Sequence, residues 1–218
     1  MDKERKQQIK EGLYELFINL IIICILVVGI RSFIVSPFQV SGPSMCDTLN
    51  TINGKCVETG ESIGEFMLIN KFKYFFSDPE RGDIVVFRPP NDERHYIKRI
   101  IGVPGDTVEI KKDNFVYLYP QGKEEIKLEE TYLNAINYGN TQVDREEYRK
   151  FEIPEGGYFV MGDNRAHSSD SRHCFSMGGC WKREDNAFIT KDKISGKAFV
   201  TLWPPANIKL IKGFDYGF

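Results

Sequence analysis

The sequence has few of the features that several common functions require. Its 218 residues include only three histidines, and 29 Lys and Arg residues are balanced by 31 Asp and Glu residues, for a formal net charge of −2. Without an excess of positive charge, the chain offers no electrostatic surface for nucleic acid. The stretch Gly42-Pro43-Ser44-Met45-Cys46 lacks the second glycine of the Gly-x-Ser-x-Gly turn that holds the nucleophile of ordinary serine hydrolases. No repeat or linker follows residue 36, so the remainder is expected to fold as one unit.

One long apolar run lies near the N-terminus. Residues 13–30 are mostly apolar, and as a helix at about 1.5 Å per residue they would extend roughly 27 Å, just enough to cross a bilayer. A cleavable signal peptide has a similar basic start and apolar centre, but no clear small-x-small cleavage site follows directly. We therefore favour a retained anchor over residues 13–35, with membrane lipid as one partner.

The charges beside this run predict its orientation. Four Lys and Arg residues precede it, whereas only Arg31 follows within about 20 residues. The positive-inside rule then predicts a single-pass protein of the cell membrane. Residues 1–12 would be cytoplasmic, and residues 36–218 would form a domain outside the cytoplasm.

The five cysteines fit this arrangement. Cys24 lies in the apolar run, and the other four form an even set in the exported part, at Cys46, Cys56, Cys174 and Cys180. In an oxidising compartment, local spacing favours the pairs Cys46–Cys56 and Cys174–Cys180 among three possible pairings. A zinc site with His167 and His173 is the alternative, but the chain has no Cys-x-x-Cys spacing. We expect no metal and no cofactor.

The exported part is expected to be mainly β. Short apolar or alternating runs between Gly, Pro and Asp turns predict strands at residues 66–69, 84–87, 96–101, 107–110, 115–119, 158–161 and 198–202. Outside the anchor, a helix is expected near residues 144–150, where Asp144 and Glu147 have the spacing of a capping box. Residues 111–150 are charged and weakly patterned, which indicates a peripheral hairpin or insertion.

Three segments carry side chains that could do chemistry. Ser44 follows a stiff Gly42-Pro43 turn, although a serine in that position is more often only a turn residue. Lys98 lies in a predicted strand among apolar neighbours, where it either extends to water or is buried. Burial would lower its pKa from about 10.4 and provide a neutral amine that can act as a base. The polar loop at residues 162–172 could simply cap turns.

In combination, these segments resemble those of the bacterial type I signal peptidases (S26 family), which are membrane-anchored Ser/Lys endopeptidases that cut signal peptides from exported proteins. The resemblance extends from the apolar run to about Pro205 and rests on three boxes in order. The first is Ser44-Met45-x-x-Thr48-Leu49. The second combines Arg81-Gly82-Asp83-Ile84-Val85 with Tyr96-Ile97-Lys98-Arg99 and Gly102-x-Pro104-Gly105-Asp106, and the third runs from Gly162-Asp163-Asn164-Arg165 through Ser168, Asp170, Ser171 and Arg172.

The resemblance implies a role for each matching residue. Ser44 would be the nucleophile, Lys98 the base that takes its proton, and Ser168 an accessory serine that orients the lysine amine. The residues implied around them are Met45 packed beside the nucleophile, Asp163 with Arg99 and Asp170 with Arg172 as bracing ion pairs, and Val40 with Ile97 as the lining of small pockets. Substrates would be the signal peptides of exported preproteins, with small residues at −3 and −1 of the cleaved bond.

Two departures from the family pattern leave alternatives open. Asp47 replaces a usual proline, and Gly42 stands where some members carry a serine that donates to the oxyanion, so the second oxyanion donor is not identified. An inactive, membrane-tethered β module that binds exported peptides is therefore the alternative function. A self-cleaving Ser/Lys repressor would need a DNA-binding module where residues 1–36 form an anchor instead. The sequence does not indicate an oligomeric state.

Overall fold

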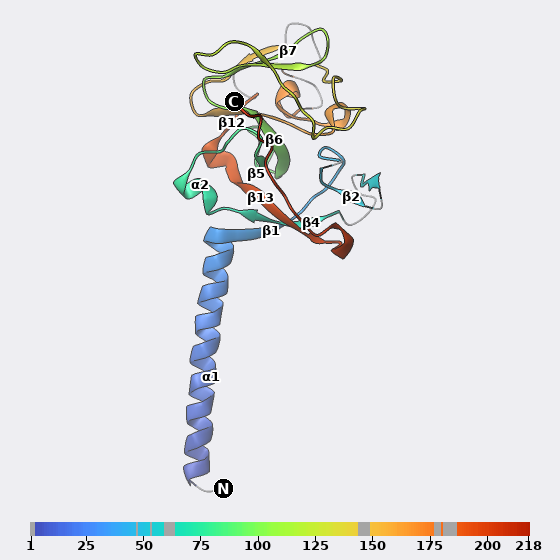
Figure 1. The fold of residues 1–218 in the computed structure, drawn as a ribbon. Coiled ribbons are helices and arrows are strands. Elements are labelled where there is room, and N and C mark those ends of the chain that lie inside the picture. Colours follow the sequence, from blue (N-terminus) through green and yellow to red (C-terminus); the bar gives the residue numbers. More distant parts are fainter. Residues whose placement is uncertain are drawn as a thin grey trace.

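The computed structural model describes residues 3–46, 48–52, 54–58, 64–143, 149–176, 180 and 187–218, with side chains from residue 7 onward. A long helix, α1 (Lys3–Gly29), projects from a β-rich body and ends in a π-helical turn, η1 (Ile30–Ile34) (Figure 1). The segment Gln7–Ile34 is long and apolar enough to cross a membrane, and none of it is buried by the rest of the protein. Such exposure of apolar side chains suits a helix surrounded by lipid.

The anchor continues directly into the main sheet, which contains eight strands in the described part of the chain. Their order is β1 (Val35–Gln39), β4 (Phe66–Asn70), β13 (Ile194–Trp203), β5 (Ile84–Phe87), β6 (Tyr96–Gly102), β11 (Gly157–Met161) and β12 (Ile189–Thr190), with β14 (Lys209–Leu210) paired to β13. All pairs are antiparallel. Since β6 lies between β5 and β11, both of its edges are covered.

A second, four-stranded sheet lies at the end of the body far from the anchor (Figure 1). It consists of β10 (Lys150–Glu152), β7 (Thr107–Ile110), β8 (Val116–Tyr119) and β9 (Ile126–Lys127) in that order. The remaining elements are the hairpin β2 (Thr51–Ile52) and β3 (Lys55–Cys56), the short helix α2 (Lys73–Phe76), and the 3-10 turns η3 (Arg165–His167), η4 (Ser171–His173), η5 (Lys191–Lys193) and η6 (Pro205–Asn207).

The predicted mainly β architecture is confirmed, and each predicted run coincides with a strand. Helix α1 begins ten residues before the predicted anchor, at Lys3, and Val35 belongs to β1 instead of the anchor. The expected helix near 144–150 has Asp144 and Glu147 outside the described residues, while Lys150 is the first residue of β10. A strand forms there because Phe151, between two exposed neighbours, is buried in the core.

Residues 111–150, expected as a peripheral insertion, supply β8 and β9 to the second sheet. Their core includes Val116 and Leu128 and extends to Phe159 of the main sheet. A buried ion pair also ties this part to η3, since Arg165 Nη1 lies 2.8 Å from Glu130 Oε2. Burying both charges is tolerated because each satisfies the other.

A separate apolar cluster lies under the N-terminal part of the body. It contains Val40, Met45, Leu49, Met67, Ile69, Ile84, Val86, Ile97, Ala198 and Ile211. Met45 and Leu49 are fully buried. Their burial fixes the turn that contains Ser44, because moving this turn would take two large apolar side chains out of the core.

Candidate active site

Ser44 lies in a tight turn just after β1. Gly42 has a φ of +79°, a conformation that glycine adopts without strain. Beyond Ser44, Cys46 N–H donates to the Pro43 carbonyl at 2.9 Å, and Leu49 N–H donates to the Met45 carbonyl at 2.8 Å. The turn is thus stabilised by its own backbone as well as by the buried Met45.

Lys98, on β6, reaches the Ser44 hydroxyl. Its Nζ lies 2.7 Å from Ser44 Oγ and also donates to the carbonyl of Ile97 at 2.9 Å. The residue is only 3% exposed. The alternative of an edge-strand lysine that extends to water is therefore wrong, because β6 is a central strand.

Burial also changes the acidity of this lysine. Removal from water lowers the pKa of Lys98 from 10.5 to about 8, with a further contribution from the positive charge of Arg172. The negative charges of Asp170 and Asp163 act in the opposite direction. Desolvation prevails, so a substantial fraction of neutral amine is present near physiological pH.

Ser168 is buried nearby, in the loop between η3 and η4. Its hydroxyl donates to Asp170 Oδ2 at 2.7 Å, and within the described residues it makes no hydrogen bond with Lys98. Asp170 in turn receives Arg172 Nε at 2.9 Å and Nη2 at 2.8 Å. Burial alone would raise the pKa of Asp170, but the charge and hydrogen bonds of Arg172, together with His173, hold it well below its ordinary value. The orienting role of Ser168 stays a prediction.

The second implied ion pair joins three parts of the site. Arg99 Nε and Nη2 bind the two carboxylate oxygens of Asp163 at 2.9 and 2.7 Å, and both residues are buried. The Thr48 hydroxyl donates to Asp163 Oδ2 at 2.5 Å, and Asp163 N–H lies 3.4 Å from Met45 Sδ. Asp163 therefore holds the Ser44 turn against β6. Sequence reasoning gave Thr48 no role, although its place in the first box was a usable signal.

Val40 and Ile97 both belong to the apolar cluster that contains Met45. They are 4% and 9% exposed, so only a small part of each is available to a ligand. The structure brings them together beside the Ser44 turn, and their role in binding substrate stays a prediction.

Both predicted disulfides are present, Cys46–Cys56 and Cys174–Cys180. The first joins the Ser44 turn to β3. Because the four thiols are paired, they offer no thiolate for the alternative zinc site. Asp47 lies outside the described residues, so its position relative to Lys98 stays open.

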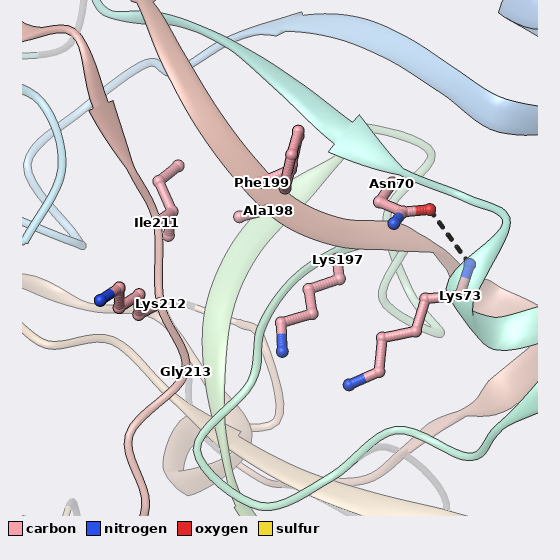
Figure 2. Close-up of a pocket in the computed structure, with 8 residues that line it drawn as sticks. All are labelled: Asn70, Lys73, Lys197, Ala198, Phe199, Ile211, Lys212 and Gly213. Atoms are coloured by element: carbon pink, nitrogen blue, oxygen red, sulfur yellow. Dashed lines mark hydrogen bonds between the residues drawn. The ribbon is translucent and has the colours of Figure 1, made fainter.

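A cavity of about 360 Å³ lies apart from these residues, beside β13 (Figure 2). It is lined by Asn70, Lys73, Lys197, Ala198, Phe199, Ile211, Lys212 and Gly213. Two of its lysines serve the buried Asp83, since Lys197 and Lys73 both form ion pairs with its carboxylate. Tyr74 donates to the same carboxylate at 2.8 Å. These contacts fix the loop before β5, and none of the predicted site residues lines the cavity.

Comparison with known proteins places the chain in a family. The sequence profile described as "Signal peptidase, peptidase S26" matches residues 13–203. Signal peptidase I of Bacillus licheniformis is 36% identical over 212 residues, covering 96% of this chain and 98% of that protein. Signal peptidase I S of Bacillus subtilis (strain 168) is 36% identical over 201 residues, covering 89% and 91%.

A more distant relative, signal peptidase I of Pseudomonas aeruginosa, is 31% identical over 226 residues, covering 87% of this chain and 73% of that protein. A crystal structure of a signal peptidase I from Enterococcus faecalis V583 has 31% sequence identity and covers 56% of this chain and 97% of its own, with a TM-score of 0.38.

The chain belongs to the signal peptidase family, peptidase S26, as the resemblance implied. It is a serine endopeptidase that removes signal peptides, and its substrates are the preproteins that carry them. The exposed apolar helix α1 accords with the membrane anchoring of this family.

Gly162 separates Ser44 from Ser168, and we predict that it tolerates no side chain. A Cβ there would lie 2.2 Å from Ser168 Oγ and 2.4 Å from the Ser44 carbonyl oxygen. Gly162→Ala should therefore displace both serines. With Ser44 as the nucleophile that the resemblance implies, kcat/KM for a preprotein should fall roughly 100-fold, because small displacements of reacting groups have effects of that size. Gly12→Ala is the control, since nothing lies within 4 Å of a Cβ at Gly12. Wild-type turnover by folded Gly162→Ala would contradict this prediction.

Proposed function

We propose that Ser44 and Lys98 form the catalytic dyad of this signal peptidase. The observation that carries the proposal is the 2.7 Å contact between Ser44 Oγ and the Nζ of a buried lysine. With a pKa of about 8, Lys98 is partly neutral near physiological pH and can then accept a proton. A Ser/Lys dyad needs no metal or cofactor.

The reaction is an acyl transfer in two stages. Ser44 Oγ attacks the carbonyl carbon of the −1 residue while its proton moves to the Lys98 amine. As the tetrahedral intermediate collapses, the Lys98 ammonium gives this proton to the leaving nitrogen of the +1 residue, and an ester to Ser44 remains. Water then attacks the ester, Lys98 takes the proton of the water, and that proton returns to Ser44 Oγ as the acid product leaves.

The surrounding groups then have supporting roles. Ser168 is proposed to orient the Lys98 amine, and its own hydroxyl is fixed by the hydrogen bond to Asp170. The pair Arg99–Asp163 holds the third loop against β6, and the pair Arg172–Asp170 braces that loop internally. Met45 is buried in the core and thereby holds the adjacent Ser44 in position.

The first prediction of this proposed function concerns the dependence of activity on pH. Since only the neutral Lys98 amine accepts a proton, kcat/KM should rise about tenfold for each pH unit below its pKa of about 8 and level off above it. Ser44→Ala and Lys98→Ala should each lower kcat roughly 10⁴-fold or more. The assay is cleavage of a preprotein with an Ala-x-Ala site by detergent-solubilised protein between pH 6 and 10.

Lys112→Ala is a suitable control, because this exposed lysine of the second sheet region should leave the profile unchanged. Appreciable cleavage by either dyad variant would overturn the mechanism. Binding of the preprotein without cleavage by the wild type would favour the inactive peptide-binding module instead.

The second prediction concerns substrate choice. We propose that Val40 and Ile97 limit the size of the residues accepted at −3 and −1. Ile97→Ala should raise the kcat/KM for a preprotein with Val at one of these positions by roughly 10-fold relative to the Ala substrate, a typical effect of a few methyl groups in a pocket. Val108→Ala, which truncates a buried residue of a different apolar cluster, controls for a general loosening of the core. An unchanged selectivity ratio would exclude Ile97 from the pocket.

The third prediction concerns topology and domain organisation. We propose a single-pass arrangement in the cell membrane, with residues 1–12 cytoplasmic, residues 13–35 within the bilayer and residues 36–218 forming the peptidase domain outside the cytoplasm. Four Lys and Arg residues precede the apolar run, which supports this orientation. Protease added to right-side-out vesicles should digest the peptidase domain, and the same protease should leave it intact in sealed inside-out vesicles. The reverse pattern would contradict the orientation.

A further inference from the structure

The oxyanion of an acyl-transfer intermediate needs a hydrogen-bond donor that already points at it. Gly42 offers no hydroxyl, so the backbone N–H of Ser44 itself is the candidate donor considered for the oxyanion. Within the described part of the protein, this N–H has no acceptor and is available. How well this N–H can stabilise the oxyanion therefore depends on how firmly the Pro43–Ser44 peptide is oriented.

Asn164 donates hydrogen bonds to the carbonyls on both sides of the Ser44 N–H. Its Nδ2 donates to the Pro43 carbonyl at 3.1 Å, and its backbone N–H donates to the Ser44 carbonyl at 3.1 Å. In a planar trans peptide, the C=O and the N–H point in opposite directions. Fixing the Pro43 oxygen toward Asn164 therefore fixes the Ser44 N–H away from it.

Further contacts support this arrangement. Asn50 Nδ2 donates to the preceding carbonyl, that of Gly42, at 2.9 Å, and its backbone N–H donates to the buried Glu65 at 2.9 Å. On the other side, Asn164 Oδ1 lies 3.4 Å from His167 Nδ1, while Nδ2 faces the Pro43 carbonyl, which can only accept a hydrogen bond. Two successive carbonyls of the turn are thus held by asparagine side chains.

We propose that Asn164 is a positioning residue that orients the Ser44 N–H toward the oxyanion. The proposal rests on the function assigned above to Ser44. It assigns Asn164 no contact with the uncleaved substrate, so Asn164 should affect the transition state and leave substrate binding unchanged.

The test compares Asn164→Leu and Asn164→Ala with the wild type. Leucine keeps the branched shape of asparagine but cannot donate, so it separates the hydrogen bond from packing. Because removal of an oxyanion donor costs 10²–10³ in kcat, a donor that is only less well oriented should cost roughly 10- to 100-fold. KM should stay within about twofold, because Asn164 makes no contact that contributes to binding of the uncleaved substrate.

A second readout distinguishes orientation from a general structural defect. A peptide aldehyde adds to the serine and places an oxygen where the oxyanion forms, whereas the matching peptide amide binds without this addition. The variants should bind the aldehyde roughly 10- to 100-fold more weakly and the amide unchanged. Asn91→Ala is the matched control, because the Asn91 amide also donates to a backbone carbonyl, that of Cys174 at 3.1 Å.

The outcomes separate this proposal from the function on which it rests. If wild type cleaves and Ser44→Ala does not, the nucleophile is established independently of Asn164. Wild-type kcat in folded Asn164→Leu, or equal losses of aldehyde and amide affinity, would then overturn the positioning role alone. Full cleavage by Ser44→Ala would overturn both proposals.

Discussion

The site depends on the burial of one amine. Lys98 lies on a central strand, out of contact with water, and a shift of its pKa from 10.5 to about 8 corresponds to roughly 3 kcal/mol of destabilisation of the charged form. The negative charges of two buried carboxylates nearby, Asp163 and Asp170, oppose this shift. Each is bound by an arginine, Arg99 or Arg172. The ion pairs that brace the loops therefore also limit the negative field at Lys98, so that the shape of the site and its acidity have a common origin.

The Ser44 turn has no regular secondary structure. Its position is therefore fixed by packing in the core and by buried polar contacts. Met45 anchors it in the apolar cluster, and Asp163 is the acceptor for Thr48 at the far end of the same box. Gly162 permits the third loop to approach within van der Waals contact of the Ser44 carbonyl. The burial of Met45, the hydrogen bond from Thr48 to Asp163 and the close approach at Gly162 together fix the position of Ser44. Such combined contacts can hold a loop residue as rigidly as a residue on a strand.

The accuracy of the sequence predictions follows the strength of the local signal. Strands β5 (Ile84–Phe87) and β7 (Thr107–Ile110) were predicted to the residue, because their β-branched residues lie between turn residues. Strand β1 was not predicted, and its first residue, Val35, was assigned to the anchor because it continues the apolar run. Two-residue strands such as β9 are too short to show any period. In the site, alternation could not decide whether Lys98 was buried, and only the resemblance to a family paired it with Ser44. Contacts such as Asn164 with Pro43, 121 residues apart, leave no local pattern at all.

The direct passage from anchor to sheet has a consequence for substrate capture. Helical structure ends at Ile34, β1 begins at Val35, and β1 is already paired with β4, so no flexible linker separates the bilayer from the peptidase domain. About ten residues lead from Ile34 to Ser44, which at about 3.3 Å per residue limits their separation to roughly 33 Å. In the proposed topology, Ser44, the proposed nucleophile, is therefore held within that distance of the membrane surface. The apolar segment of a signal peptide lies in the same bilayer, so substrate and enzyme are confined to one plane. This confinement raises the effective concentration of the substrate, so that tight binding of the small −3 and −1 residues is not needed.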